Sequence, residues 1–250
     1  MREIEIGYTT LKAMFDKGDV INNKYVVTGE CSSSGGMGTV VFVDEVDNVS
    51  SDTLVLKYCK IDEDETKQRF RREVRFLNEF KDNPKVVQIV DADLNHTPPY
   101  FVMRYYHEGD LVSLRKDLEN NYELQEKVFN QMIECINELH IQNKYHRDIK
   151  PQNFLRDGDL VIVSDFGLST EIGSSTAMTK SSQWWGTHGY IPPEFTMDDG
   201  GFRNADASSD IFMLGKSFYS LLSGNDNPQY LIKDNIPDAL FLIIQRCCEV

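Results

Sequence analysis

The chain has 250 residues, of which 40% are hydrophobic, enough to bury a substantial core in one large domain or two lobes. Forty acidic against 26 basic residues give a formal charge of -14, which argues against general binding to nucleic acid or to an anionic membrane. The five cysteines are odd in number and form no CxxC pair, so we expect reduced thiols. Glu3 and Glu5 stand where a signal peptide would be basic, and no apolar run approaches the ~20 residues that cross a bilayer. These features predict a soluble, cytoplasmic protein.

The first hundred residues read mainly as strands. Short segments rich in β-branched and aromatic residues are bounded by turn formers, a pattern typical of strands. Five such segments are predicted, at residues 24–31, 39–46, 53–60, 85–92 and 99–106. The glycine- and serine-rich stretch at 32–38 predicts a loop between the first two.

A helix is predicted between the third and fourth strands, at residues 62–81, because the segment is acidic at its start and basic later, as the helix dipole favours. Phe70, Val74 and Leu77 share one face of this helix. Glu73 lies on the same inward face, and burying an unpaired carboxylate is costly. We therefore expect Glu73 to have a cationic partner.

The second half of the chain reads mainly as helix. Apolar residues recur at helical spacing in residues 123–143, 208–224 and 238–250, and FLRDGDLVIVSDFG, from residue 154, predicts a hairpin. The expected fold class is α+β, with a small antiparallel-sheet lobe carrying one helix and a larger, mainly helical lobe. The two lobes would meet near residue 106, and a cleft at such a boundary commonly binds a ligand.

The stretch YHRDIKPQN, residues 145–153, crowds an acid, two strong bases, an imidazole and an amide into nine residues. It lies within an ordered series of motifs: a glycine-rich loop, a strand lysine, a helix glutamate, HRD, DFG and a segment ending in PE. This series resembles the eukaryotic-type (Hanks-type) serine/threonine protein kinase family, from about Tyr25 to the end of the chain. The implied organisation is an N-terminal extension (1–24) and a kinase domain (25–250), divided into an N-lobe (25–105) and a C-lobe (106–250).

The resemblance assigns roles in phosphoryl transfer to the second half. Asp148 of HRD would orient the acceptor hydroxyl and take its proton, while Lys150 would neutralise the transferring group. Asn153 and Asp165 of DFG would bind magnesium. The crowding of charge is then expected, because phosphoryl transfer concentrates negative charge and needs fixed cations close to a hydroxyl acceptor.

The first half would hold the nucleotide. Lys57 in LVLK occupies the position of the lysine that grips the α and β phosphates, and Glu73 is its implied partner. Met103 would be the gatekeeper of the adenine site. The linker at 104–107 would contact adenine through its backbone, including Arg104 and Tyr106.

The glycine-rich loop departs from the family pattern. Aligning backwards from Gly38 and Val40 places Gly35 second and Ser33 where the first glycine is usual. Serine makes that turn with less backbone freedom than glycine, so weaker nucleotide binding is expected.

The segment after DFG closes with GTHGYIPPE. Thr187 resembles the substrate-loop threonine and is expected to contact Asp148 and Lys150, while Asp210 would anchor the catalytic loop. The arginine that pairs with the glutamate at the position of Glu194 is absent from the sequence. Either the chain is a fragment or a substitute cation serves.

Regulation by phosphate is a further hypothesis. In the family, an arginine before the catalytic aspartate, here Arg147, is often paired with a phosphate on the activation segment. Residues 169–187 contain hydroxyl side chains, and we favour 176–182 as the modified window. The cations at 67–75 could assist, although a solvated helix face is the preferred interpretation. These residues are Lys67, Arg69, Arg71, Arg72 and Arg75.

The sequence thus predicts a kinase that transfers the ATP γ-phosphate to serine or threonine hydroxyls of proteins, using Mg2+ and phosphorylating its own activation segment. The main alternative is a pseudokinase, a nucleotide-gated binding or scaffold module. All the residues that pseudokinases often lack are present, which favours catalysis. A kinase of small molecules is disfavoured by GTHGYIPPE, which resembles a platform for protein substrates. The expected partners are protein substrates and ATP, with no nucleic acid and no membrane.

Overall fold

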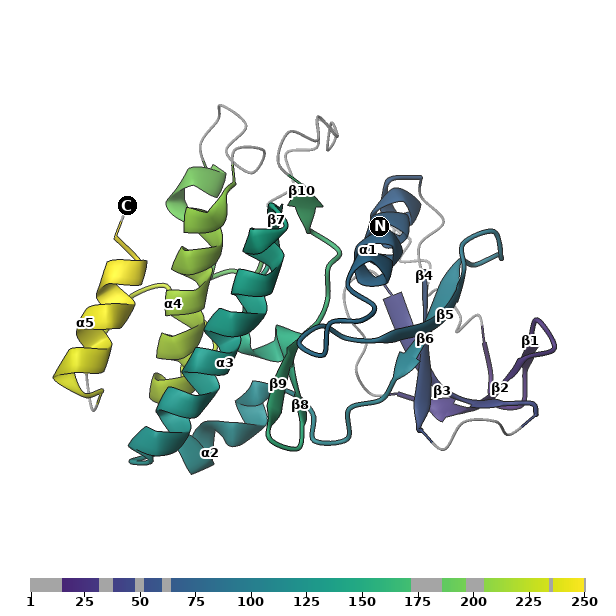
Figure 1. Ribbon diagram of the computed structural model, residues 1–250, viewed down its shortest axis with the longest axis horizontal. Coiled ribbons are helices and arrows are strands. Elements are labelled where there is room, and N and C mark those ends of the chain that lie inside the picture. Colours follow the sequence, from purple (N-terminus) through teal and green to yellow (C-terminus); the bar gives the residue numbers. More distant parts are fainter. Residues whose placement is uncertain are drawn as a thin grey trace, which may run out of the picture. The chain divides into compact units, whose positions relative to one another are not determined.

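The structure is a computed structural model that describes residues 15–31, 38–47, 52–59, 64–171, 186–196, 205–233 and 236–249. The described chain divides into two compact units (Figure 1). Unit 1 contains the described residues up to Val74 together with Ile89–Tyr105, and unit 2 contains Arg75–Gln88 and the described residues from Tyr106 onward.

Unit 1 is built on a six-stranded antiparallel sheet with the strand order β1-β2-β3-β4-β6-β5. The strands are β1 (Val20–Ile21), β2 (Tyr25–Glu30), β3 (Gly38–Glu45), β4 (Leu54–Cys59), β5 (Ile89–Asp93) and β6 (Tyr100–Arg104). Strand β4 is buried along almost its whole length, which explains its near-continuous apolar sequence LVLKYC. All five predicted strands form, and the two-residue β1 is additional.

Polar side chains tie the two edges of this sheet together. Lys24 Nζ lies 2.7 Å from Asp91 Oδ2, and the Tyr25 hydroxyl donates to the same oxygen at 3.0 Å. Asn22 Nδ2 donates to Asp93 Oδ2 at 2.9 Å. Burial raises the pKa of Asp91, but the hydrogen bonds from Lys24 and Tyr25 outweigh it and leave the pKa below its ordinary value. The sheet is therefore curled, with its β1 end bonded to β5.

Helix α1 (Asp64–Glu79) follows β4. Phe70 is buried and contacts Phe101 of β6, with ring centroids 5.4 Å apart, and Val74 and Glu73 are also buried, as the spacing predicts. The solvated-face interpretation is correct for Arg71 and Arg75, which are exposed, but wrong for Arg69, which is only 3% exposed. A long arginine stem can lie along apolar surface, so position on the helix does not by itself fix its exposure.

Unit 2 is mainly helical. Its principal helices are α2 (Arg115–Leu118), α3 (Tyr122–Ile141), α4 (Ala207–Ser223) and α5 (Asp238–Cys247). Helices α3 and α4 run side by side (Figure 1), with Phe129 stacked on Phe218 at 4.2 Å between centroids. Asp206 and Ser209 form a capping box at the start of α4, and Gly224 caps its end.

A hairpin of β8 (Phe154–Asp157) and β9 (Leu160–Val163) packs against α3. The Cys135 thiol of α3 donates to the carbonyl of Val161 at 3.2 Å, and Gln131 Oε1 accepts from the Val161 N–H at 2.7 Å. Strands β7 (Lys144–Tyr145) and β10 (Thr170–Glu171) form a short antiparallel pair, and the chain between them carries HRD, the β8–β9 hairpin and DFG. Short 3-10 helices complete the unit, at η1 (Leu111–Leu114), η2 (Pro151–Asn153) and η3 (Pro193–Thr196).

The strand predicted at 85–92 begins later than expected. Strand β5 starts at Ile89, whereas Val86 forms an isolated parallel bridge with Val163 of β9, inside unit 2. Val86 and Val87 are both buried, so the apolar pattern was read correctly as burial but assigned to the wrong sheet. Among the described residues, no helix has the length and apolar character needed to cross a membrane.

Candidate active site

The loop that carries HRD connects β7 to β8, and a buried carboxylate on helix α4 holds its backbone. Asp210, on α4 and 0% exposed, accepts the backbone N–H groups of His146 and Arg147, both at 2.9 Å. His140 Nε2 lies 2.9 Å from the same carboxylate. Arg147 has a φ of 67°, in the left-handed region, so the loop turns sharply just before Asp148. The predicted anchoring contact of Asp210 is therefore present.

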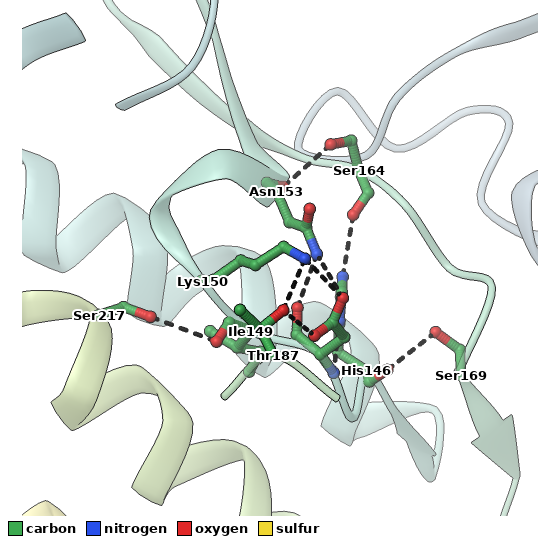
Figure 2. Close-up of polar contacts among 9 residues, drawn as sticks. His146, Ile149, Lys150, Asn153, Ser164, Ser169, Thr187 and Ser217 are labelled. Carbon is green, nitrogen blue, oxygen red and sulfur yellow. Dashed lines mark hydrogen bonds and ion pairs between the residues drawn. The ribbon is translucent and has the colours of Figure 1, made fainter. Parts of the chain in front are cut away.

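Further polar contacts hold the loop from both sides (Figure 2). The buried His146 ring lies with Nε2 3.0 Å from the Ser164 carbonyl, and its backbone carbonyl accepts from Ser169 Oγ at 3.3 Å. Ser217 of α4 donates to the Ile149 carbonyl at 3.4 Å. The loop has no regular secondary structure at these residues, but hydrogen bonds fix it to the neighbouring segments and to α4.

The side chains of Lys150, Asn153 and Thr187 lie close together at the centre of Figure 2. Lys150 Nζ lies 3.0 Å from Asp148 Oδ2 and donates to Thr187 Oγ1 at 2.8 Å. Thr187 in turn donates to Asp148 Oδ1 at 3.0 Å. Asn153 Nδ2 donates to the Asp148 carbonyl at 2.7 Å. The predicted contacts of Thr187 with Asp148 and Lys150 are confirmed, and they place a hydroxyl between a carboxylate and an ammonium group.

Asn153 and Asp165 are the residues predicted to bind magnesium. The hydrogen bond from Asn153 Nδ2 to Asp148 fixes the amide, so its oxygen points away from the loop (Figure 2). Asp165 has a φ of 61° and follows Ser164, whose hydroxyl donates to the Asn153 carbonyl at 3.0 Å. The described residues hold no cluster of three or more His, Cys, Asp or Glu suited to a metal. One carboxylate and one amide oxygen fit Mg2+, a hard cation that keeps several of its waters.

Phe166 of DFG is packed between two aromatic rings of unit 2. It is 1% exposed, stacks on Phe76 of α1 at 4.5 Å between centroids and contacts the His146 ring at 5.1 Å. Lys144 of β7 reaches the same end of α1, where its Nζ lies 2.6 Å from Glu79 Oε2. The contact of Phe76 and the Lys144–Glu79 pair were not predicted, although an apolar face continuing past Val74 was a signal for the first.

In unit 1, Lys57 and Glu73 form the expected ion pair. Lys57 Nζ of β4 lies 2.6 Å from Glu73 Oε1 of α1, and the two side chains are 11% and 3% exposed. Gly38 of β3 passes close to this lysine: a Cβ at Gly38 would meet Lys57 Cγ and Cε at 3.1 Å and the Tyr58 carbonyl at 3.1 Å. The buried carboxylate thus has a cation, and Gly38 leaves room for the lysine stem.

One face of the unit 1 sheet carries a small apolar cluster. Val40, Val55 and Cys31 are buried there, with Met103 packed against them, so Cys31 is a packed thiol. Strand β6 ends at Arg104, and Tyr106 is buried within unit 2, where its hydroxyl accepts from the Gln88 N–H at 3.4 Å. Ser33 and Gly35 lie outside the described residues, so their predicted contacts stay predictions.

The activation segment is described only at its ends. The favoured phosphorylation window at 176–182 lies outside the described residues. Ser169 is buried and bonded to the catalytic loop. Glu194 accepts a hydrogen bond from Ser209 Oγ, at 2.5 Å, which is a neutral partner rather than a substitute cation.

Comparison with known proteins agrees with this geometry. Residues 32–241 match the model of the protein kinase domain family. The chain belongs to this family, and its fold is the two-lobed α+β fold of protein kinases.

Similar curated proteins come from distant organisms. CBL-interacting protein kinase 10 of Oryza sativa subsp. japonica is 29% identical over 210 residues, covering 83% of this chain and 46% of the relative. Serine/threonine-protein kinase PrkC of Bacillus subtilis (strain 168) is 32% identical over 199 residues, covering 76% of this chain and 29% of the relative. The chain spans less than half the length of these relatives.

Proposed function

We propose that the protein is an ATP-dependent serine/threonine protein kinase. The observation that carries this proposal is the cluster of Asp148, Lys150 and Thr187, in which a carboxylate and an ammonium group both contact one hydroxyl. The carboxylate oxygens of Asp148 can accept the proton of a substrate hydroxyl, and Lys150 can stabilise the charge of the transferring phosphoryl group. Family membership and the names of the similar proteins support the same activity.

Magnesium, when bound, would supply charge neutralisation on the nucleotide phosphates. Asn153 would contribute its amide oxygen and Asp165 its carboxylate. The hydrogen bond from Asn153 Nδ2 to the Asp148 carbonyl supports this assignment, because it orients the amide oxygen away from the loop. The buried Phe166 then holds the backbone beside Asp165 through its packing on Phe76 and His146.

Unit 1 would bind the nucleotide. Lys57, held by Glu73, would contact the α and β phosphates, and the apolar cluster with Val40 and Met103 would contact the adenine ring. The predicted contributions of Ser33, Gly35 and Gly38 through the glycine-rich loop, and of Arg104 and Tyr106 through backbone groups, belong to the same proposal. Its support is the ion pair and the close approach of Gly38 to Lys57.

Protein substrates, phosphorylation of the activation segment by the kinase itself, and a cytoplasmic location remain part of the proposal. Thr187 on the segment GTHGY contacts Asp148, as expected of a platform that presents an acceptor. The alternative of a pseudokinase predicts nucleotide binding without transfer.

The decisive experiment measures transfer from radiolabelled ATP to a mixture of generic protein substrates with Mg2+, followed by phosphoamino acid analysis. Asp148→Asn is expected to lower turnover by about 10²–10⁴-fold, since it removes the proton acceptor while keeping the side-chain shape. Asp159→Asn is the matched control, because the Asp159 side chain is 91% exposed and its carboxylate lies 2.6 Å from Lys127 Nζ of α3. Wild-type turnover in Asp148→Asn would refute the assigned role, and nucleotide binding without any transfer by the wild type would favour the pseudokinase.

A further inference from the structure

The turn that carries Thr187 is seated on the loop after α4. The Tyr190 N–H donates to the Thr187 carbonyl at 3.0 Å, which closes the turn. Gly189, at its tip, has a φ of 89° and lies against the neighbouring loop so closely that a Cβ would meet Asn227 Oδ1 at 2.3 Å and Pro228 N at 2.9 Å. Only glycine fits both the backbone conformation and the space. The loop at 225–229 therefore forms a close-fitting seat for this turn.

Side chains on both flanks of the turn also bind neighbouring elements, His188 the 225–229 loop and Tyr190 helix α4. His188 Nδ1 lies 3.0 Å from Asn227 Oδ1. The Tyr190 hydroxyl donates to Ser220 Oγ at 2.8 Å, and Arg115 Nη2 bridges Ser220 at 3.0 Å and Asp226 at 2.7 Å. The turn is thus fixed to α4 and to the 225–229 loop by contacts that involve no phosphate.

The seat is itself held by an unusual buried lysine. Lys216 projects from α4, is 6% exposed, and donates through Nζ to the carbonyls of Pro228 at 2.8 Å and Gln229 at 3.0 Å. Its ammonium also lies 5.4 Å from the centre of the Phe212 ring. Within the described residues it has no carboxylate at ion-pair distance, so the two carbonyls are its polar partners. Burying a cation is costly, and burial lowers the pKa of Lys216.

We propose that Lys216 is a positioning residue for the acceptor platform, acting through the 225–229 loop on the Gly189 turn and hence on Thr187. This inference rests on the proposed kinase function and deepens it. It states that the substrate-binding segment keeps its conformation because it packs on the 225–229 loop, which Lys216 holds in place. Lys216 touches no reacting group. Its loss is expected to affect the protein substrate and to leave the nucleotide unaffected.

The test compares three variants of this chain. Lys216→Met removes the ammonium but keeps an unbranched apolar stem, Lys216→Arg keeps donors to the two carbonyls, and Lys127→Met makes the same change as the first at a surface ion pair of the same unit. In Lys216→Met we expect amide exchange at Tyr190 to accelerate about tenfold or more and KM for a protein substrate to rise about tenfold. The Kd for ATP should be unchanged in all three variants.

The proposal is supported if the amide exchange rate at Tyr190 and the KM for the protein substrate both return part of the way to wild type in Lys216→Arg and are unchanged in Lys127→Met. Wild-type exchange at Tyr190 and wild-type KM in Lys216→Met would overturn it, as would an equal loss of ATP affinity. Gly189→Ala supplies a second route if Lys216→Met does not fold, because the added Cβ collides with Asn227 and should raise exchange and KM in the same way. The exchange measurement stays informative if the wild type phosphorylates nothing, so failure of the proposed function is distinguishable from failure of this inference.

Discussion

The two units support their functional residues in opposite ways. Lys57 of unit 1 lies on β4, an inner strand whose ladders to β3 and β6 fix its backbone, and an ion pair with Glu73 orients its side chain. Asp148 of unit 2 lies on a loop with no ladder of its own. Its neighbours His146 and Arg147 are fixed instead by the buried carboxylate of Asp210.

The difference shows where each unit is vulnerable. In a sheet, the backbone hydrogen bonds are shared among many residues, so one side-chain change leaves the backbone in place. In the loop, buried N–H groups depend on particular side-chain acceptors, and losing one acceptor leaves those groups unsatisfied. Replacing the buried Asp210 carboxylate, which accepts the N–H groups of the loop, should therefore lower both the stability and the activity. Replacing Lys57 should lower the activity more than the stability.

The largest expected effect follows from Asp210→Ala. Two buried N–H donors lose their acceptor, at about 1–3 kcal/mol each, so the free energy of unfolding should fall by several kcal/mol. Turnover should fall by about 10²-fold or more, because the catalytic loop is misplaced. Urea unfolding and the transfer assay measure the two quantities. Asp159→Ala, at a carboxylate 91% exposed, is the control and should change the unfolding free energy by less than about 1 kcal/mol.

Lys57→Met should come next and separate activity from stability. Removing the phosphate-binding cation is expected to lower kcat/KM by about 10²–10³-fold. The buried Glu73 carboxylate loses its 2.6 Å partner, so stability should also fall. Adding Glu73→Gln to this variant removes the buried charge.

The double variant should therefore regain part of the lost stability but none of the lost transfer. Chemical denaturation and initial-rate kinetics on the same preparations make this comparison. Recovery of transfer in the double variant would show that Lys57 acts only by neutralising Glu73.

A smaller effect is expected at the curled edge of the unit 1 sheet. Because the pKa of Asp91 is lowered in the folded protein, its contribution to stability is present above its unfolded pKa, near 4, and is lost as pH falls further. Asp91→Asn should cost about 1 kcal/mol at pH 7 and progressively less toward pH 3. Urea unfolding at several pH values measures this, with Asp44→Asn, at an exposed residue of β3, as the control. A cost that does not change with pH would mean that the charge of Asp91 contributes nothing.

The last prediction concerns the packing of α3 on the β8–β9 hairpin and needs no substitution. Burial raises the pKa of the Cys135 thiol to about 12, and the residue is 0% exposed. Its reaction with iodoacetamide at pH 8 in the native protein should be slower than that of the half-buried Cys247 by on the order of 100-fold. Peptide mapping after timed labelling gives both rates. Equal rates would mean that α3 and β9 separate readily.

Much of this molecule could be predicted from its sequence, for identifiable reasons. Alternation and β-branching identify the five strands, helical periodicity identifies α1, α3, α4 and α5, and Glu73 could be assigned a cation because an inward carboxylate needs one. The cluster around Asp148 could be predicted because its residues lie in two recognisable motifs, HRDIKPQN and GTHGY.

Contacts that depend on which surfaces meet were not predictable. The pattern of Val86 indicates burial but not that its partner is Val163 of unit 2. Arg69 reads as a solvated cation because sequence gives no measure of how its stem is covered, and for the same reason the sequence does not show that Lys216 is buried. The glycine at 189 gave no sign of its neighbour Asn227, because their approach depends on the packing of two loops.

The curled sheet of unit 1 has a consequence for association between molecules. Edge strands present unpaired backbone groups that can template pairing with another chain. Val20 on β1 and Val90 on β5 are 55% and 52% exposed, so each edge also offers an apolar side chain. The charged bonds of Lys24 and Asp91 place a desolvation cost on any chain that would add a strand there, since they must be broken or buried first. The same contacts that curl the sheet thereby protect its edges from aggregation.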